Sequence, residues 1–261
     1  MHSQLIPGLP FQTYGLCVAA GALAGAWIIE RLSGRKEAGA LVAWLVLAGI
    51  AGARIAHVVE YWHADGFDRD FASVFAIWKG GLVFYGGLAG GIVAFLAWCA
   101  AKRENPLAWA DLLCVAIPLG HAFGRIGCFF HGCCWGKVSQ SALAVTFPAG
   151  SPAWHARHAS SIAARSLPVL PVQLFEAAAL ATLFALLLLL YRRFKAFTAA
   201  AYFASYGVIR FLLEFLRDDE RPSAFGLSSA QLFSIALAAV GAAIFAISLR
   251  RRHAEHTCNN R

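Results

Sequence analysis

Charged side chains are scarce in this 261-residue sequence, where Asp, Glu, Lys and Arg together make up 14%. Soluble domains carry about 25% charged residues. Hydrophobic residues account for 59% of the chain, and its mean hydropathy is +0.62. The composition therefore excludes an ordinary soluble domain and indicates an integral membrane protein.

The sequence also lacks several features that would indicate other classes of protein. The sequence has no internal repeat, low-complexity tract or interdomain linker, and its apolar stretches do not alternate with polar residues as they would in a transmembrane β-barrel. No basic stripe interleaved with aromatic residues accompanies the net charge of +8, so nucleic acid is not an expected partner. The first apolar stretch has no small-residue cleavage site, which predicts a retained helix. We expect a single all-α transmembrane domain over residues 1–261.

Apolar runs of about 20 residues, the length of a membrane-crossing helix, recur along the chain. They predict seven spans: Phe11–Ile29, Ala40–Tyr61, Leu82–Ala101, Ala108–Phe123, Val172–Tyr191, Thr198–Leu216 and Ser229–Leu249. The fourth span is short and leads into a polar motif, so we expect non-helical backbone to begin there. An amphipathic arm is expected at about 62–80 and a small head at about 124–171.

Basic residues gather in alternate connections between these spans. They are Arg31, Arg35 and Lys36; Lys102 and Arg103; Arg192, Arg193 and Lys195; and Arg250, Arg251 and Arg252. Positive residues mark the cytoplasmic face, so we expect the C-terminus inside and the N-terminus outside. The arm and the head would then lie on the outer, periplasmic side, and the basic residues would also attract anionic lipid.

The most unusual stretch is HAFGRIGCFFHGCCWG at residues 121–136. Arg125 stands between Gly124 and Gly127, where backbone can approach a ligand because glycine has no side chain. Its guanidinium group can donate two hydrogen bonds to a phosphate. The structural alternative is an arginine that snorkels from a helix end to the lipid headgroups.

Two earlier spans also carry polar groups. Arg54 would cost about 3 kcal/mol at a helix centre, so we expect it either to contact an anion in a polar cavity or to snorkel to the outer interface. Tyr85 is bracketed by the two glycine pairs of GGLVFYGG (80–87), which would let backbone crowd a partner helix or a lipid headgroup. A tyrosine of the aromatic belt is the simpler interpretation of Tyr85.

The later spans hold a second group of polar residues. Gln173 and Glu176 lie about one turn inside the fifth span, and an unpaired Glu176 would be costly, so we expect it to bond to an arginine or a backbone amide. The sixth span carries four residues spaced to share one helical face: Tyr206, Arg210, Glu214 and Arg217. Two arginines against one glutamate leave positive charge for an anionic ligand, and a self-satisfied Arg–Glu–Arg ladder is the alternative.

Arg54, Arg125 and Arg210 fall at or near the outer ends of different spans. We expect them to converge at one depth and to form a site for an anionic lipid headgroup.

The seven cysteines allow several interpretations. Cys128, His131, Cys133 and Cys134 could bind zinc, Cys128 could form a disulfide with Cys133 or Cys134, or the thiols could be free. The spacing does not follow an ordinary zinc pattern, and adjacent cysteines rarely both ligate one ion, so no metal and no cofactor is predicted. Three other cysteines fall within apolar spans and are expected in the core: Cys17, Cys99 and Cys114.

Over nearly its whole length, the chain resembles the bacterial prolipoprotein diacylglyceryl transferases. The matching stretches are Tyr14-Gly15, Gly52-Ala53-Arg54, GGLVFYGG (80–87), GRIGCFFHGCCWG (124–136), PVQLFE (171–176), YGVIRFLLEFLR (206–217) and LSSAQLFS (227–234). The resemblance implies an enzyme of the bacterial cytoplasmic membrane that moves the diacylglyceryl group of phosphatidylglycerol to the lipobox cysteine of exported prolipoproteins and releases glycerol phosphate. Phosphatidylglycerol, prolipoprotein signal peptides and the lipid bilayer would be its partners.

The resemblance also implies roles for particular residues. Arg125 and Arg210 match essential arginines of the family and are our candidates for stabilising the charge of the departing phosphate, with Tyr85 as a further catalytic candidate. The residues expected to bind substrate or shape the site are Tyr14, Arg54, Gly127, Cys128, His131, Gln173, Glu176, Tyr206, Glu214 and Arg217.

The chain departs from the family pattern in two places. Tyr85 stands where the family usually has a histidine that is a candidate for deprotonating the thiol, and tyrosine, with a pKa of about 10 against about 6.5, is a poorer base. Either the base is dispensable, or His121 or His131 substitutes, or the acceptor has changed.

The second departure is in the central motif, where Cys128, His131 and Cys133 replace asparagine, asparagine and glutamate. Two alternatives therefore stay open: a divergent protein acting on another thiol or lipid acceptor or in redox or metal chemistry, and a non-catalytic lipid-binding or transport bundle.

Overall fold

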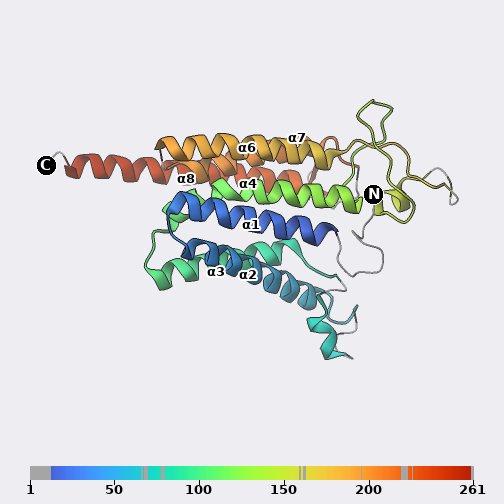
Figure 1. Cartoon of the computed structure of the whole chain (residues 1–261), viewed down its shortest axis with the longest axis horizontal. Helices are drawn as coiled ribbons and strands as arrows, with labels where there is room; N and C mark the ends of the chain where they lie inside the picture. Colours follow the sequence, from blue (N-terminus) through green and yellow to red (C-terminus); the bar gives the residue numbers. More distant parts are fainter. Residues whose placement is uncertain are drawn as a thin grey trace. The chain divides into compact units, whose positions relative to one another are not determined.

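The structure, a computed structural model, describes residues 13–65, 67, 70–77, 80–158, 160, 163–194, 196–218, 223–224 and 226–259 (Figure 1). Its helices are α1 (Thr13–Ser33), α2 (Glu37–Glu60), the 3-10 helix η1 (Phe71–Phe75), α3 (Phe84–Lys102), α4 (Pro106–His131), α5 (Pro152–Ala156), α6 (Val172–Phe194), α7 (Thr198–Glu214) and α8 (Ser229–Asn259). A two-stranded antiparallel hairpin, β1 (Ser223–Ala224) and β2 (Leu227–Ser228), precedes α8.

Among the described residues, six helices are long and apolar enough to cross a membrane, namely α1, α2, α3, α4, α6 and α8. The chain is therefore a multi-pass, all-helical membrane protein, as its composition predicts. Each of the seven predicted spans overlaps one helix, but α7 has only 17 residues, and its crossing stays a prediction. Some predicted features fall partly outside the described residues: the start of the first span, several positions of the arm, and Lys195.

Helix α4 does not end where the sequence predicted. It continues through Gly124 and Gly127 to His131, so the prediction of non-helical backbone in this stretch is wrong, while the head at about 124–171 stays a prediction. The helical arrangement satisfies the backbone groups of this segment internally, which matters in an apolar environment. The helix stops at Gly132, whose φ of 79° is left-handed and whose amide donates to the Cys128 carbonyl at 2.9 Å.

The chain forms two compact units. The large unit comprises Met1–Gly25 and Ala110–Arg261, and the small unit comprises Ala26–Trp109. The prediction of one domain stays a prediction.

The small unit is built on close contact between α2 and α3. A Cβ built on Gly90 would lie 2.5 Å from the Ala48 carbonyl oxygen, and one on Gly86 would lie 2.5 Å from the Gly52 carbonyl oxygen. Only glycine permits this approach, as in other helix pairs that meet through small residues. The glycine pair after Tyr85 therefore serves helix packing, one of the two roles that the sequence suggested for it.

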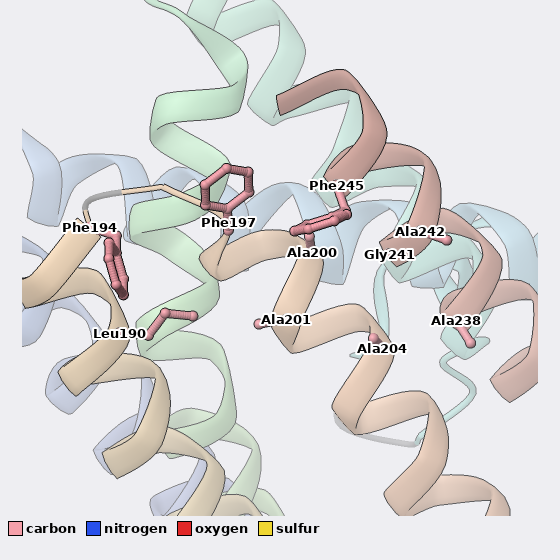
Figure 2. A pocket seen from close by; sticks show the side chains of 10 residues that line it. All are labelled: Leu190, Phe194, Phe197, Ala200, Ala201, Ala204, Ala238, Gly241, Ala242 and Phe245. Atoms are coloured by element: carbon pink, nitrogen blue, oxygen red, sulfur yellow. The ribbon is translucent and has the colours of Figure 1, made fainter. Parts of the chain in front are cut away.

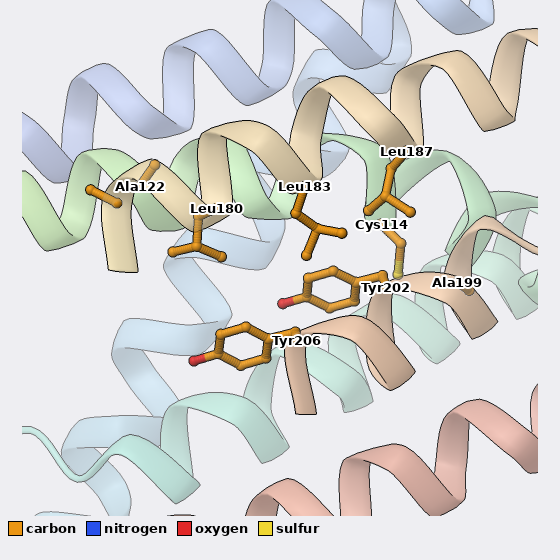
Figure 3. Packing of buried hydrophobic residues seen from close by; sticks show 9 residues of the cluster. Cys114, Ala122, Leu180, Leu183, Leu187, Ala199, Tyr202 and Tyr206 are labelled. Carbon is orange, nitrogen blue, oxygen red and sulfur yellow. The ribbon is translucent and has the colours of Figure 1, made fainter. Parts of the chain in front are cut away.

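The large unit packs α7 against both α6 and α8. Its core is formed by Cys114, Ala122, Ala177, Leu180, Leu183, Leu187, Ala199, Tyr202 and Tyr206 (Figure 3). The rings of Tyr202 and Tyr206 stack with centroids 5.8 Å apart. Asp111 of α4 accepts a hydrogen bond from the Ala199 amide at 2.7 Å and so satisfies an unpaired donor at the start of α7. The predicted core positions of Cys99 and Cys114 are confirmed.

An apolar cavity of about 550 Å³ lies among α6, α7 and α8 (Figure 2). It is lined by Leu190, Phe194, Phe197, Ala200, Ala201, Ala204, Ala238, Gly241, Ala242 and Phe245. The lining residues from α7 belong to its N-terminal part, whereas Arg210 and Glu214 lie in its C-terminal part.

The segment from Gly132 to Pro171 is mostly irregular but has its own small core of Phe147, Ala153 and Val169. Isolated bridges join Val169 to both Val138 and Val145. Another bridge joins Gly136 to Arg217, which ties this segment to the chain that leaves α7.

Candidate active site

Glu176 of α6 is fully buried and forms the centre of a polar cluster in the large unit. Its Oε1 lies 3.0 Å from Arg125 Nη2 of α4 and accepts a hydrogen bond from the Tyr206 hydroxyl of α7 at 3.4 Å. His121 places its Nε2 3.8 Å from the same oxygen. The prediction that Glu176 bonds to an arginine is confirmed, and the pairing offsets the large cost of burying a carboxylate.

A second buried carboxylate, Glu214, lies at the end of α7. Its Oε2 lies 2.7 Å from Arg210 Nη2 and 3.9 Å from Arg217 Nε. Ser228 donates its hydroxyl to Glu214 Oε1 at 2.6 Å. The Arg–Glu–Arg ladder that the sequence suggested as a structural alternative is thus formed.

Arg217 does not belong to the helical face on which the sequence placed it. Helix α7 ends at Glu214, and the Arg217 amide donates to the Glu214 carbonyl at 3.2 Å in a tight turn. The helix cannot continue because the next residues pair elsewhere: the Lys137 amide donates to the Leu216 carbonyl at 2.9 Å, and Arg217 forms a bridge with Gly136.

The two carboxylates and the arginines form one connected cluster. Tyr206, which contacts Glu176, lies one helical turn before Arg210, which contacts Glu214. Arg125 and Arg210 therefore come from different helices to the same part of the large unit. Three arginines face two glutamates, which leaves one net positive charge for an anion.

Both of the principal arginines keep donors that the protein does not use. Among the described residues, the buried Arg125 Nε and Arg210 Nη1 have no hydrogen-bond partner. A buried donor without a partner costs about 1–3 kcal/mol. An anionic ligand such as a phosphate could accept both hydrogen bonds. The two glutamates would hold the arginines in place for such a ligand.

Three thiols lie at the end of α4, close to this cluster. The sulfur atoms of Cys128, Cys133 and Cys134 all lie within 4.8 Å of one another, and the six cysteines whose side chains are described are free. Gln173 is fully buried and donates its amide to the Cys133 carbonyl at 2.6 Å. Hydrogen bonds with Cys128 and Cys133 and the nearby Arg217 guanidinium lower the pKa of the Cys134 thiol, against burial, which raises it.

Tyr14 and Gly127 meet where α1 packs on α4. A Cβ built on Gly127 would lie 3.1 Å from the Cys17 Cβ and 3.1 Å from the Tyr14 ring, so this glycine permits a close helix contact. A Cβ on Gly124 would meet nothing within 4 Å, so it is this glycine that leaves open space beside Arg125. His131 is half-buried as the last residue of α4.

Arg54 lies in the small unit and has a different environment. Its guanidinium donates to four backbone carbonyls, those of Val74 at 2.8 Å, Ser73 at 2.7 Å, Gly80 at 2.9 Å and Gly81 at 3.0 Å. The arginine is buried and fastens this part of the predicted arm to α2. Arg54 therefore has hydrogen-bond partners, as its position predicted, and these partners are carbonyl groups. Its contact with an anion stays a prediction.

Tyr85 also belongs to the small unit, at the start of α3. Its side chain is 56% exposed and contacts the Phe84 ring at 5.7 Å. The convergence of the small-unit residues with Arg125 and Arg210 stays a prediction.

Two residues contribute more to the site than the sequence indicates. The family pattern suggests His121 only as a substitute base, yet it lies between Glu176 and Tyr206, whose ring centroid is 5.2 Å from its own. Its spacing of four residues from Arg125 is the signal that places both on one face of α4. Ser228 lies in the matching stretch LSSAQLFS (227–234), but nothing in the sequence indicates its contact with Glu214, which depends on the hairpin before α8.

The chain is similar to proteins of a known family. A family model described as prolipoprotein diacylglyceryl transferase matches residues 3–247. The phosphatidylglycerol–prolipoprotein diacylglyceryl transferase 2 of Clostridium perfringens (strain 13 / Type A) is 30% identical over 250 residues, which cover 92% of each chain. The phosphatidylglycerol–prolipoprotein diacylglyceryl transferase of Vibrio vulnificus (strain YJ016) is 31% identical over 253 residues, or 92% of this chain and 88% of the relative. The enzyme of that name from Allorhizobium ampelinum is 30% identical over 264 residues, or 92% and 85%.

Proposed function

Because the chain belongs to the prolipoprotein diacylglyceryl transferase family, we propose that it transfers the diacylglyceryl group of phosphatidylglycerol to the lipobox cysteine thiol of an exported prolipoprotein. A sulfur–carbon bond forms at the glyceryl carbon while the bond from that carbon to the phosphate oxygen breaks. The thiol proton passes to a base, and glycerol phosphate leaves with the electron pair of the broken bond.

The observation that carries this proposal is the pair of buried arginines with unused donors. Arg125 Nε and Arg210 Nη1 supply two hydrogen bonds to the phosphate as negative charge develops on it. Fixed donors in a water-poor site stabilise such charge more strongly than water does, because they need no reorganisation during the reaction. Glu176 and Glu214 hold the two guanidinium groups in this arrangement.

The remaining polar residues shape the site around this pair. Tyr206 fixes Glu176, and Arg217 supports Glu214. Gln173 holds the turn that carries the thiols. The end of α4 and its contact with α1 border the arginine cluster, and substrate contacts are proposed there for Tyr14, Gly127, Cys128 and His131. Arg54 is proposed to act through the arm that it fastens.

The proton acceptor is proposed to be His121. Its imidazole lies 3.8 Å from the Glu176 carboxylate, beside the arginine cluster. Tyr85 occupies the usual place of the family's histidine, and we propose that its hydroxyl contacts the reacting groups.

A substitution series at Tyr85 tests this last assignment. Tyr85→Phe removes only the hydroxyl and is expected to lower kcat by about tenfold, whereas Tyr85→His, which restores a group able to transfer protons, is expected to retain activity. Equal kcat values for the wild type and Tyr85→Phe would exclude Tyr85 from the chemistry.

We also propose the location of the enzyme. Basic residues in alternate connections favour a bacterial cytoplasmic membrane protein with seven crossings including α7, an outer N-terminus and a cytoplasmic C-terminus. The segment after α4 and the ends of α6 and α7 that carry the arginine cluster would then face the periplasm.

The activity is tested by complementation of a bacterial strain depleted of its own transferase. The wild-type chain should restore growth and lipoprotein modification, and Arg125→Ala and Arg210→Ala should abolish both at normal membrane levels. Arg192→Ala removes an exposed arginine at the end of α6 and should rescue fully. Rescue by either Arg125→Ala or Arg210→Ala would contradict the proposed role of that arginine. Phosphatidylglycerol binding by purified wild type without turnover would favour the non-catalytic alternative.

A further inference from the structure

The three thiols at the end of α4 converge because of the backbone there. Neighbouring residues of an extended chain point to opposite faces, so adjacent cysteines do not usually reach one ion. Here Cys134 adopts a left-handed φ of 62°, directly after the left-handed turn at Gly132 with a φ of 79°. These two turns fold the chain back on the last turn of α4 and bring Cys133 and Cys134 together with Cys128.

We propose that Cys128, Cys133 and Cys134 form a three-thiolate site for Zn²⁺ or another thiophilic d10 ion, with a fourth position left to an exchangeable ligand. Zinc lies about 2.3 Å from each thiolate in tetrahedral sites, which places the sulfur atoms about 3.8 Å apart. Since the three sulfur atoms already lie within 4.8 Å of one another, binding requires each pair to approach by at most about 1 Å.

The surroundings of the thiols fix the ligand-bearing backbone. The amides of Gly132 and Cys133 donate to the Cys128 carbonyl at 2.9 and 3.2 Å, and Gln173 donates to the Cys133 carbonyl at 2.6 Å. Such outer contacts orient ligands and raise the affinity of a metal site. The site is therefore held from both the helix end and α6.

Charge and access also suit a thiophilic cation. Three thiolates and one Zn²⁺ carry a net charge of −1, and the positively charged Arg217 guanidinium lies close to Cys134. The three thiols are half-buried, so an ion can reach them from outside. Sulfur ligands favour zinc and copper(I) over magnesium and calcium. The sequence-based expectation of no metal rested on the unusual ligand spacing and on the adjacency of Cys133 and Cys134, and the proposed site departs from it.

The test measures metal binding by the full-length protein in detergent after reduction with a phosphine and removal of excess Zn²⁺. About one zinc per chain is expected in the wild type, and Cys128→Ser, Cys133→Ser and Cys134→Ser should each lower the affinity by at least about tenfold. Cys99→Ser, which alters a buried thiol outside the site, should bind like the wild type. Cobalt(II) in place of zinc should give thiolate-to-metal charge-transfer bands that weaken in each site variant.

Equal zinc affinity of the wild type and Cys128→Ser overturns the proposal, as does the absence of thiolate charge-transfer bands. If a serine variant fails to fold, reversible methylthiolation of the wild-type thiols supplies the comparison, and zinc retained after that treatment also overturns it. The measurement is independent of transferase activity: Arg125→Ala should bind zinc normally even though it is inactive.

Discussion

Arg54 in the small unit and Arg125 in the large unit are both largely buried arginines in apolar helices, but they are used differently. Arg54 donates to four backbone carbonyls of a neighbouring segment. Arg125 has one ion pair with Glu176 and keeps its Nε without a protein partner among the described residues. Arg54 therefore uses its hydrogen-bond donors within the fold, whereas Arg125 keeps a donor that can bind a ligand.

The largest effect on activity is expected when Arg125 or Arg210, each of which keeps an unused donor, is removed. Arg125→Ala and Arg210→Ala should each lower kcat by about 10²–10³-fold, because each removes a donor aimed at developing phosphate charge. Purified variants assayed with phosphatidylglycerol and a lipobox peptide measure this, with Arg192→Ala as the control. An unchanged kcat in Arg125→Ala or Arg210→Ala would contradict the role assigned to that arginine.

Arg54 provides the opposite case. Arg54→Ala leaves four carbonyls without their donor and should destabilise the segment around Ser73 and Val74 by about 2–4 kcal/mol. Hydrogen exchange of residues 70–77 should accelerate accordingly, while the amides of α6 keep their protection. Arg54→Lys, which keeps the charge without the planar set of donors, should recover only part of the loss. If hydrogen exchange of residues 70–77 is unchanged in Arg54→Ala, Arg54 does not stabilise this segment and the contrast with Arg125 is wrong.

A smaller effect is expected at the residue that links the two carboxylate centres. Tyr206→Phe removes the 3.4 Å hydrogen bond to Glu176 but keeps the ring stacked on Tyr202. A hydrogen bond of this kind contributes about 0.5–1.5 kcal/mol, so kcat should fall about three- to tenfold with little change in thermal stability. A fall as large as that of Arg125→Ala would show that Tyr206 itself takes part in the chemistry.

The smallest effect is expected at an exposed pair, Arg35 and Glu104, whose side chains meet at 2.6 Å. Hydrogen bonds from Trp109 and Arg35 lower the pKa of the Glu104 carboxylate. Because its folded-state pKa lies below its ordinary value, the pair stabilises the small unit above that value, and this contribution is lost as the pH falls through the folded-state pKa. Thermal unfolding of wild type and Glu104→Gln should therefore differ slightly at neutral pH and converge in acid. A difference in thermal stability between the two proteins that persists in acid would contradict the stabilising role of this pair.

The sequence predicts the helices well because continuous apolar runs leave few alternatives in a membrane. It also singles out the polar residues of those runs, and the spacing of Tyr206, Arg210 and Glu214 by itself indicates a common helical face. The end of α4 differs from its prediction because the fourth apolar run is short and leads into a polar motif, whereas the helix continues through this motif and packs at Gly127 against Tyr14 and Cys17.

The partners of the arginines could not be assigned from the sequence. Arg54 and Arg125 have equally apolar surroundings along the chain, and their difference arises from contacts across elements. The carbonyls that bind Arg54 depend on the left-handed glycines Gly80 and Gly81. The convergence of the thiols likewise depends on the left-handed conformation of Cys134, which is uncommon for any residue other than glycine.

The short length of α7 has a consequence for the surrounding lipid. Seventeen residues at a rise of about 1.5 Å give a helix of about 26 Å, several ångströms less than the hydrocarbon core of about 30 Å. Asp111 at its first turn and Glu214 at its last fix both ends to other parts of the protein, so it cannot lengthen to match. A crossing by α7 would therefore thin the bilayer beside it and draw lipid phosphates inward toward Arg210.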